Sequence, residues 1–126
     1  MKITDLTITL FKQEGIPTGI AKRHTGAIGG DSQLGLVTIS TDEGIEGHSF
    51  LGSSGRSAEF DCGSLIHYLK PIVMGQNPLD RERIFETMIL ISRNTTLRAV
   101  GAVDVALWDL AGKIAGLPIH QLLGTY

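Results

Sequence analysis

The 126-residue sequence has little of several features that mark special classes of protein. Cys62 is its one cysteine, so an intrachain disulfide is impossible and a reducing compartment, the cytoplasm, is expected. No apolar run approaches the ~20 residues of a membrane-spanning helix, and the N-terminus lacks the continuous apolar stretch of a signal peptide. A formal net charge of −2 gives no electrostatic reason to expect nucleic acid or an anionic membrane as partner.

What is present is ordinary for one folded domain. Hydrophobic residues make up 42% of the chain and charged residues 19%, a balance typical of globular rather than disordered proteins. A chain of this length is one domain by the usual prior, and folding buries roughly two thirds of its extended surface. We therefore expect a single domain over residues 1–126 with a core of its own.

Three stretches near the N-terminus alternate aliphatic and polar side chains, a period that favours strands with one buried face. These stretches are Ile3–Phe11, Leu34–Thr41 and Ile45–Leu51. The tight turn Asp42-Glu43-Gly44 joins the last two strands. The first two are joined by Lys12–Gln33, a long loop with scattered glycines and no period. This order predicts a three-stranded antiparallel meander.

Two amphipathic helices are expected next. The first has Ser57 as its N-cap, and Pro71 kinks or ends it before Gly75. Its apolar face is predicted to be Cys62, Leu65, Ile66, Leu69 and Val73. The second opens at Asn77-Pro78, with proline at the first helical position. Its apolar stripe is predicted to be Ile84, Phe85, Met88 and Ile89, and its water-facing residues Arg81, Glu82, Arg83 and Glu86.

A third helix has the strongest pattern. Thr95 or Thr96 caps its start, and Gly116 stops it. Its apolar positions recur at three- and four-residue steps: Val100, Val103, Leu107, Leu110 and Ile114. Asp109 precedes Lys113 by four residues, an acid-base pair worth about 0.2–0.5 kcal/mol. Strands followed by about three helices predict an α+β fold.

The residues alone show no catalytic or metal-binding constellation. The histidines are far apart: His24, His48, His67 and His120. Asp61-Cys62 and His67 share the first helix but not one face, so no metal site is expected in this chain. Cys62 is expected to be a small buried hydrophobe. Asp104 lies among apolar neighbours, so we expect it to have a hydrogen-bonding partner and a structural role.

Two loops carry the candidate ligand contacts. In Gly52–Ser57 the glycines are too close together for a P-loop, and Arg56 stands where lysine is needed, so no nucleotide site is expected. Arg56 is instead a candidate for gripping a carboxylate. Lys22-Arg23-His24, on the earlier loop, is a candidate contact for an acidic ligand. The alternative for both loops is that these side chains are merely solvated.

The stretch 99–124, AVGAVDVALWDLAGKIAGLPIHQLLG, strongly resembles a signature of the mandelate racemase/muconate lactonizing group of the enolase superfamily. The elements that carry the resemblance are Ala99, Ala102, Asp104, Ala106-Leu107, Asp109, Ala111-Gly112-Lys113, Pro118 and Leu122-Leu123-Gly124. LVTISTDEGIEGHSF is similar to the N-terminal hairpin of that family, and NPLDRERIFETM to the helix that follows it. The resemblance covers essentially the whole chain.

The resemblance implies a capping domain that precedes a (β/α) barrel. Two capping loops close over the barrel mouth in that family, and they correspond here to Ile16–Gln33 and Gly52–Ala58. The implied substrate contacts are Lys22, Arg23, His24, Ser53, Ser54 and Arg56. The implied reaction removes the proton α to a carboxylate, giving an enediolate stabilised by Mg²⁺. Catalytic and metal residues lie at barrel strand ends, so none is expected in this chain, and Mg²⁺ belongs to the parent enzyme.

Two hypotheses of different class follow. The first is the capping domain of a Mg²⁺-dependent enolase-superfamily enzyme, a racemase, an acid-sugar dehydratase or a cycloisomerase, not catalytic alone. Its polar, cationic loops favour an acid-sugar substrate, and its apolar surface, meant for the barrel, predicts self-association of the isolated domain. The second is a stand-alone binding or assembly module of the same fold. The reading frame after Tyr126 discriminates them, because a barrel needs about 250 residues.

Overall fold

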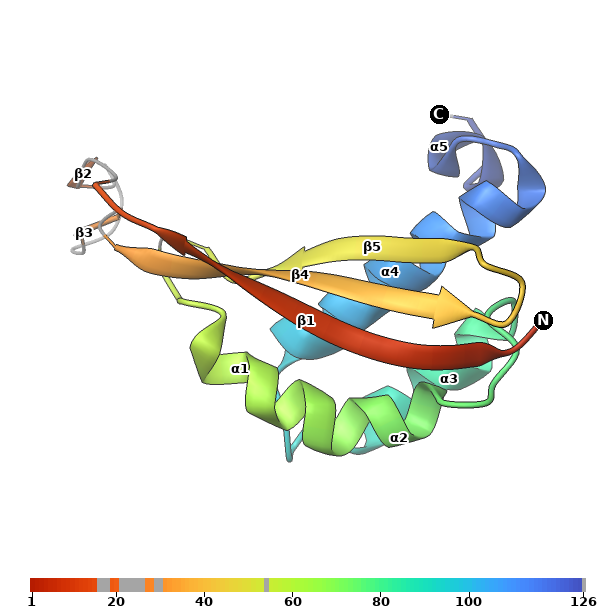
Figure 1. Ribbon diagram of the computed structural model, residues 1–126, viewed down its shortest axis with the longest axis horizontal. Coiled ribbons are helices and arrows are strands. Elements are labelled where there is room, and N and C mark those ends of the chain that lie inside the picture. The colour runs from red at the N-terminus through yellow and green to blue at the C-terminus, as the bar shows by residue number, and fades with distance from the viewer. Residues whose placement is uncertain (16–18, 21–26, 29–30, 54, 126) are drawn as a thin grey trace.

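The computed structural model describes residues 1–15, 19–20, 27–28, 31–53 and 55–125. It has a three-stranded antiparallel sheet in the order β1-β4-β5, followed in the chain by helices (Figure 1). The strands are β1 (Ile3–Gln13), β2 (Gly19–Ile20), β3 (Ala27–Ile28), β4 (Ser32–Thr41) and β5 (Glu46–Leu51). The helical elements are α1 (Glu59–Ser64), η1 (Leu65–Leu69), α2 (Lys70–Val73), α3 (Arg81–Leu90), α4 (Leu97–Ala115) and α5 (Ile119–Leu122). The predicted α+β class and meander are confirmed.

One face of the sheet forms one side of the hydrophobic core. From Gly35 to Thr41 in β4 every second residue is buried, as the period-two pattern predicts, and Val37 and Ile39 are fully buried. Leu6 from β1 and Leu51 from β5 lie on the same face. The helices supply the opposite half of the core: Leu65, Leu69, Val73, Ile84, Met88, Val100, Val103, Leu107 and Leu110. The core therefore lies between one sheet face and the helices.

The closest approach in the core is between β5 and α4. A Cβ added at Gly47 would lie 2.2 Å from the Ala106 carbonyl oxygen, so only glycine fits there. The Ser49 hydroxyl donates to the carbonyl of Ala102. The His48 N–H donates to Asp109 Oδ2 at 2.8 Å. Asp109 therefore holds the helix to the strand, in addition to its pairing along the helix.

The connection between β1 and β4 is shorter than predicted. The expected loop began at Lys12, but Lys12 pairs with Gln33 and Gln13 with Ser32, so both strands run further. Between them, β2 and β3 form a two-residue antiparallel ladder. This hairpin extends beyond the end of the sheet that is far from the N-terminus (Figure 1). Backbone pairing extends β1 and β4 here, although the alternation of apolar and polar residues does not continue into these positions.

Two predictions for the first helix are corrected. Ser57 is not its N-cap: the helix begins at Glu59, and Ser57 Oγ accepts the N–H of Gln33 instead. Pro71 does not end the helix, which continues to Val73. The preceding turn, η1, is π-helical, with the Lys70 N–H bonded to the Leu65 carbonyl. A wider turn leaves room for the proline ring and shifts the helical phase.

Some faces of the helices also differ from prediction. In the first helix Ile66 is exposed and Cys62 is only half-buried, so neither belongs to the buried face that Leu65, Leu69 and Val73 form. The second helix begins at Arg81 rather than at Asn77-Pro78, since Asn77 Oδ1 caps a turn by accepting the Leu79 N–H. Two members of its predicted stripe, Phe85 and Ile89, are more than a third exposed.

Helix α4 matches its prediction at both ends. The Thr96 hydroxyl accepts the N–H of Ala99 at 3.1 Å, so Thr96 is the cap. Gly116 ends the helix in the left-handed conformation, with φ of 65°. The Lys113 ammonium lies 2.6 Å from Asp109 Oδ2 and also donates to the Glu46 carbonyl. The predicted pair therefore also reaches the sheet.

Candidate functional site

The turn after β5 has a fixed backbone. Gly52 has a φ of 96°, and a Cβ there would lie 2.8 Å from the Ala58 nitrogen, so glycine is required. Ser53 and Arg56 exchange two backbone hydrogen bonds of 2.8 and 3.2 Å. Because these two N–H groups are used inside the turn, they are unavailable to a phosphate.

Beyond this turn the chain is tied to the end of β4. Ser57 Oγ accepts the Gln33 N–H at 2.8 Å, and the Ala58 N–H donates to the Gln33 carbonyl at 2.8 Å. The hairpin β2–β3 extends from the same end of the sheet (Figure 1). Sequence-distant segments are therefore brought to one end of the molecule, on a rigid strand.

Arg56 binds a carboxylate inside this chain. Its Nε and Nη2 donate to the two oxygens of Asp61, at 2.8 and 2.9 Å. The Asp61 side chain is 1% exposed and that of Arg56 is 40% exposed. The Arg56 hydrogen bond is the main cause that lowers the pKa of Asp61, against burial, with a contribution from Thr96. Arg56 also lies 5.5 Å from the centre of the Phe60 ring.

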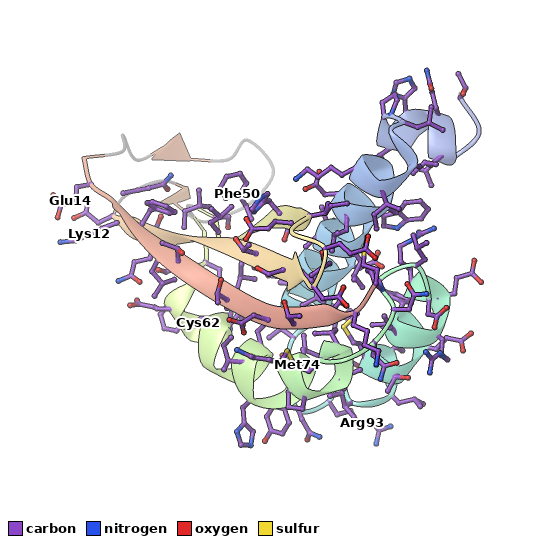
Figure 2. The ribbon with its side chains drawn as sticks, turned by 45° about the vertical axis from the view of Figure 1, so that its right-hand side comes forward. Lys12, Glu14, Phe50, Cys62, Met74 and Arg93 are labelled. Carbon is purple, nitrogen blue, oxygen red and sulfur yellow. The ribbon has the colours of Figure 1, made fainter. Side chains whose placement is uncertain are left out.

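A cavity of about 460 Å³ lies beside this ion pair, and we name it the end cavity. Side chains from both ends of the β1–β4 connection and from the start of α1 line it, among them Lys12, Gln33, Arg56, Ser57, Glu59 and Phe60. Figure 2 shows Lys12 and Glu14 next to each other at the far end of β1, where they form an ion pair. The end cavity is therefore lined by charged side chains of both signs together with apolar surface such as Phe60.

The structure places the predicted contacts unevenly. Ser53 and Arg56 lie in the same turn, joined by their backbones and by the bond from the Arg56 N–H to Ser53 Oγ. Four predicted contacts lie outside the described residues: Lys22, Arg23, His24 and Ser54. Their role, like substrate contact by Ser53 and Arg56, stays a prediction. Sequence reasoning missed Asp61 as the partner of Arg56.

Gln33 was also missed as a lining residue. Its side-chain Oε1 is buried without a hydrogen-bonding partner, while its backbone holds the turn. The sequence placed Gln33 at the end of a loop, because the strand pattern begins only at Leu34. Its pairing with Lys12 across the sheet was the missing information.

A second polar cluster lies between α3 and α4. The Arg81 guanidinium stacks over Trp108 at 3.5 Å, so the prediction that Arg81 faces water is wrong. Burial raises the pKa of Asp104, and the charge of Arg81 opposes that shift. Among the described residues, the charge of Arg81 rather than the expected hydrogen bond therefore compensates the carboxylate of Asp104, which is half-buried.

The described residues form neither a cluster of metal ligands nor a membrane-spanning helix. No three His, Cys, Asp or Glu side chains among the described residues gather closely enough to hold a metal ion. The structure therefore offers no described donor set that fits Mg²⁺, which prefers several oxygen ligands in octahedral geometry. No helix among the described residues combines the length and apolar character that crossing a membrane requires.

Comparison with known proteins gives a family match over most of the chain. The N-terminal domain of the mandelate racemase/muconate lactonizing enzyme family matches residues 9–124. A D-galactonate dehydratase family member from Paenibacillus sp. (strain JDR-2) is 43% identical over 95 residues, covering 71% of this chain and 23% of that protein. The N-succinyl-L-Arg/Lys racemase of Bacillus cereus is 35% identical over 97 residues, covering 71% of this chain and 25% of the racemase.

Solved structures agree with this match. A dipeptide epimerase from Enterococcus faecalis V583, complexed with Mg and the dipeptide L-Leu-L-Tyr, is 30% identical with a TM-score of 0.84. The match covers 100% of this chain and 35% of the epimerase. The chain thus spans about a quarter of the length of the curated relatives it matches.

Proposed function

We propose a function from the premise that this chain belongs to the mandelate racemase/muconate lactonizing enzyme N-terminal domain family. The domain caps the active site of an enolase-superfamily enzyme that removes the proton α to the carboxylate of its substrate. Dehydratases and a racemase among the relatives support a reaction of this class. The cap selects the substrate and does not perform the chemistry.

The observation that carries this proposal is the gathering of loops at one end of the sheet. The turn at 52–58 is clamped to Gln33, and the β2–β3 hairpin extends from the same end. Loops on a rigid scaffold are the usual location of binding residues. The end cavity lies among them, so the substrate-facing surface of the cap is assigned to this end.

The metal of the parent enzyme is assigned to a barrel outside this domain. The described residues provide no group of metal ligands, so no catalytic step is derived through Mg²⁺ for this chain. The Mg-complexed epimerase supports a Mg²⁺-dependent parent. The single cysteine of this chain supports a reducing, cytoplasmic setting as part of the proposal. Self-association of the isolated domain stays a prediction.

The proposal is tested with a chimera. This chain replaces the matching N-terminal region of the Paenibacillus relative, and turnover of D-galactonate, D-mannonate and other acid sugars is measured with and without Mg²⁺. We expect no turnover by the 126-residue chain, none by the truncated relative, and Mg²⁺-dependent turnover of at least one acid sugar by the chimera.

Two results would contradict it. Turnover by the 126-residue chain alone would show that the domain is not merely a cap. A chimera that folds, as judged by circular dichroism, but turns over none of the acid sugars would favour the stand-alone module instead.

A further inference from the structure

Asp61 is a buried carboxylate whose position explains how Arg56 is presented to the end cavity. We infer that Asp61 is a positioning residue for substrate selection: it fixes Arg56 so that the free N–H groups of that guanidinium bind hydroxyl oxygens of a polyhydroxy carboxylate. This inference rests on the proposed function and adds to it a substrate class and the residue pair that recognises it.

The geometry of the guanidinium leaves donors available. An arginine side chain carries five N–H donors in a planar arrangement. Asp61 accepts one from Nε and one from Nη2, at 2.8 and 2.9 Å. The other edge of the guanidinium, with Nη1 and the second N–H of Nη2, is not used by Asp61. Arg56 is 40% exposed and lines the end cavity, so these donors are accessible to a ligand.

The pair is held in place from several sides. Asp61 is 1% exposed, at the start of α1, and Thr96 at the start of α4 contributes to lowering its pKa. Phe60 lies under the guanidinium at 5.5 Å. The backbone of Arg56 is fixed by Ser53. A donor held in this way loses little conformational entropy when a ligand binds.

The charges around the cavity favour hydroxyl groups over a further ion. Lys12 is paired with Glu14, and Arg56 with Asp61. Asp31 accepts the N–H of Gly15. The same cavity offers Glu59 as an acceptor beside the free donors of Arg56. Hydroxyl groups both donate and accept, so a polyol chain matches this mixture better than an aliphatic or peptide side chain does.

The test uses the ¹⁵N-labelled 126-residue chain, titrated with D-galactonate, neutral galactitol and hexanoate up to about 100 mM, above the millimolar Kd that a few hydrogen bonds support. Galactonate and galactitol are expected to shift the Arg56 Nε–H signal and the backbone signals of residues 55–60. Hexanoate, a carboxylate without hydroxyls, is expected to leave them unchanged. Absence of these shifts with both hydroxylated probes would overturn the inference.

Variants separate positioning from folding. Asp61→Asn is expected to weaken galactitol binding about fivefold or more, the loss of roughly one hydrogen bond, and to make the Arg56 Nε–H exchange with water faster than it does in the unaltered chain. Arg56→Lys keeps the charge but not the planar donors, so it gives the same loss if Asp61→Asn does not fold. Asp80→Asn, which breaks the exposed Arg83–Asp80 pair, is the matched control and is expected to bind like the unaltered chain.

A kinetic measurement in the chimera completes the test. Asp61→Asn is expected to raise the KM for an acid sugar about fivefold with little change in kcat, because Asp61 touches no reacting atom. Equal galactitol binding by Asp61→Asn and the unaltered chain would overturn the inference even if the chimera is active. An inactive chimera with the expected shifts would contradict the proposed function and leave the binding result standing.

Discussion

The β5–α4 contact and the end cavity are both built around polar groups, but they differ in how completely those groups are used. At the contact, Ser49 donates to Ala102, His48 donates to Asp109, and Lys113 bonds both Asp109 and Glu46. At the end cavity, Arg56 has donors that Asp61 does not use, and Gln33 Oε1 has no hydrogen-bonding partner among the described residues. At the β5–α4 contact the polar groups bond to one another, whereas at the end cavity some donors and acceptors are available to a ligand.

The difference separates a structural role from a functional one. Buried polar groups in a finished core are matched, because an unmatched one costs free energy. The signature residue Asp109 lies at the β5–α4 contact and serves the fold. Arg56 and Gln33 lie outside that signature, in a turn and at a strand end, whereas Asp104 lies inside it and also lacks partners like those of Asp109. Family resemblance therefore identified the scaffold, while Arg56 and Gln33 at the end cavity remain candidates for ligand contact.

The largest expected effect comes from breaking the β5–α4 contact. Gly47→Ala would put a Cβ 2.2 Å from the Ala106 carbonyl oxygen and 2.9 Å from Leu110 Cγ, so helix and strand must separate. We expect a loss of about 3 kcal/mol or more in the free energy of unfolding, measured by urea denaturation. Gly101→Ala is the matched control on α4, since nothing lies within 4 Å of its Cβ. It should stabilise by up to about 1 kcal/mol, and a Gly47→Ala variant of unchanged stability would contradict the close contact.

A smaller effect is expected at the end cavity. Asp61→Asn removes the charge from a buried acceptor, and we expect a loss of about 1.5–3 kcal/mol at pH 7. The pKa of Asp61 is lowered in the folded state, chiefly by Arg56. The stabilisation is therefore complete above the unfolded pKa of about 3.9 and is lost as pH falls through the lower folded value. Denaturation curves from pH 7 down to 2 should show the two proteins converging in acid, and a constant difference would argue against the ion pair.

The sequence predicted elements whose residues interact locally. The alternation of apolar and polar residues predicted β4 and β5. Thr96 and Gly116 marked the ends of α4, because caps act within one helical turn. Of the two alternatives for Pro71, that it kinks or that it ends the helix, the sequence could not choose, because the π-turn before Pro71 depends on how the whole helix packs. The extension of β1 to Gln13 depends on a partner strand that the pattern did not reveal.

The site was less predictable for the same reason. The sequence suggested Arg56 as a contact for the carboxylate of a ligand, which stays a prediction, and it did not reveal the internal pair of Arg56 with Asp61. The sequence indicated only that Asp61 is an acidic residue in the first turn of a helix. The fold brings it within hydrogen-bonding distance of Arg56. Ser57 was assigned to the helix start, whereas its hydroxyl meets Gln33, 24 positions away. Contacts between distant segments decide both cases.

The smallest expected effect concerns Asp104, which among the described residues has neither the hydrogen-bonding partners of Asp109 nor the strong pair of Asp61. Burial raises its pKa, and the opposing charge of Arg81 only partly compensates. Its ionised form therefore disfavours folding, and that cost is absent below the unfolded pKa of about 3.9 and grows as pH rises through the folded value. Asp104→Asn should thus be neutral or stabilising by less than about 0.5 kcal/mol at pH 7, with the gain vanishing at pH 3. A clear destabilisation at pH 7 would show that Asp104 is a matched group like Asp109, and the division between used and unused polar groups would then have to be redrawn.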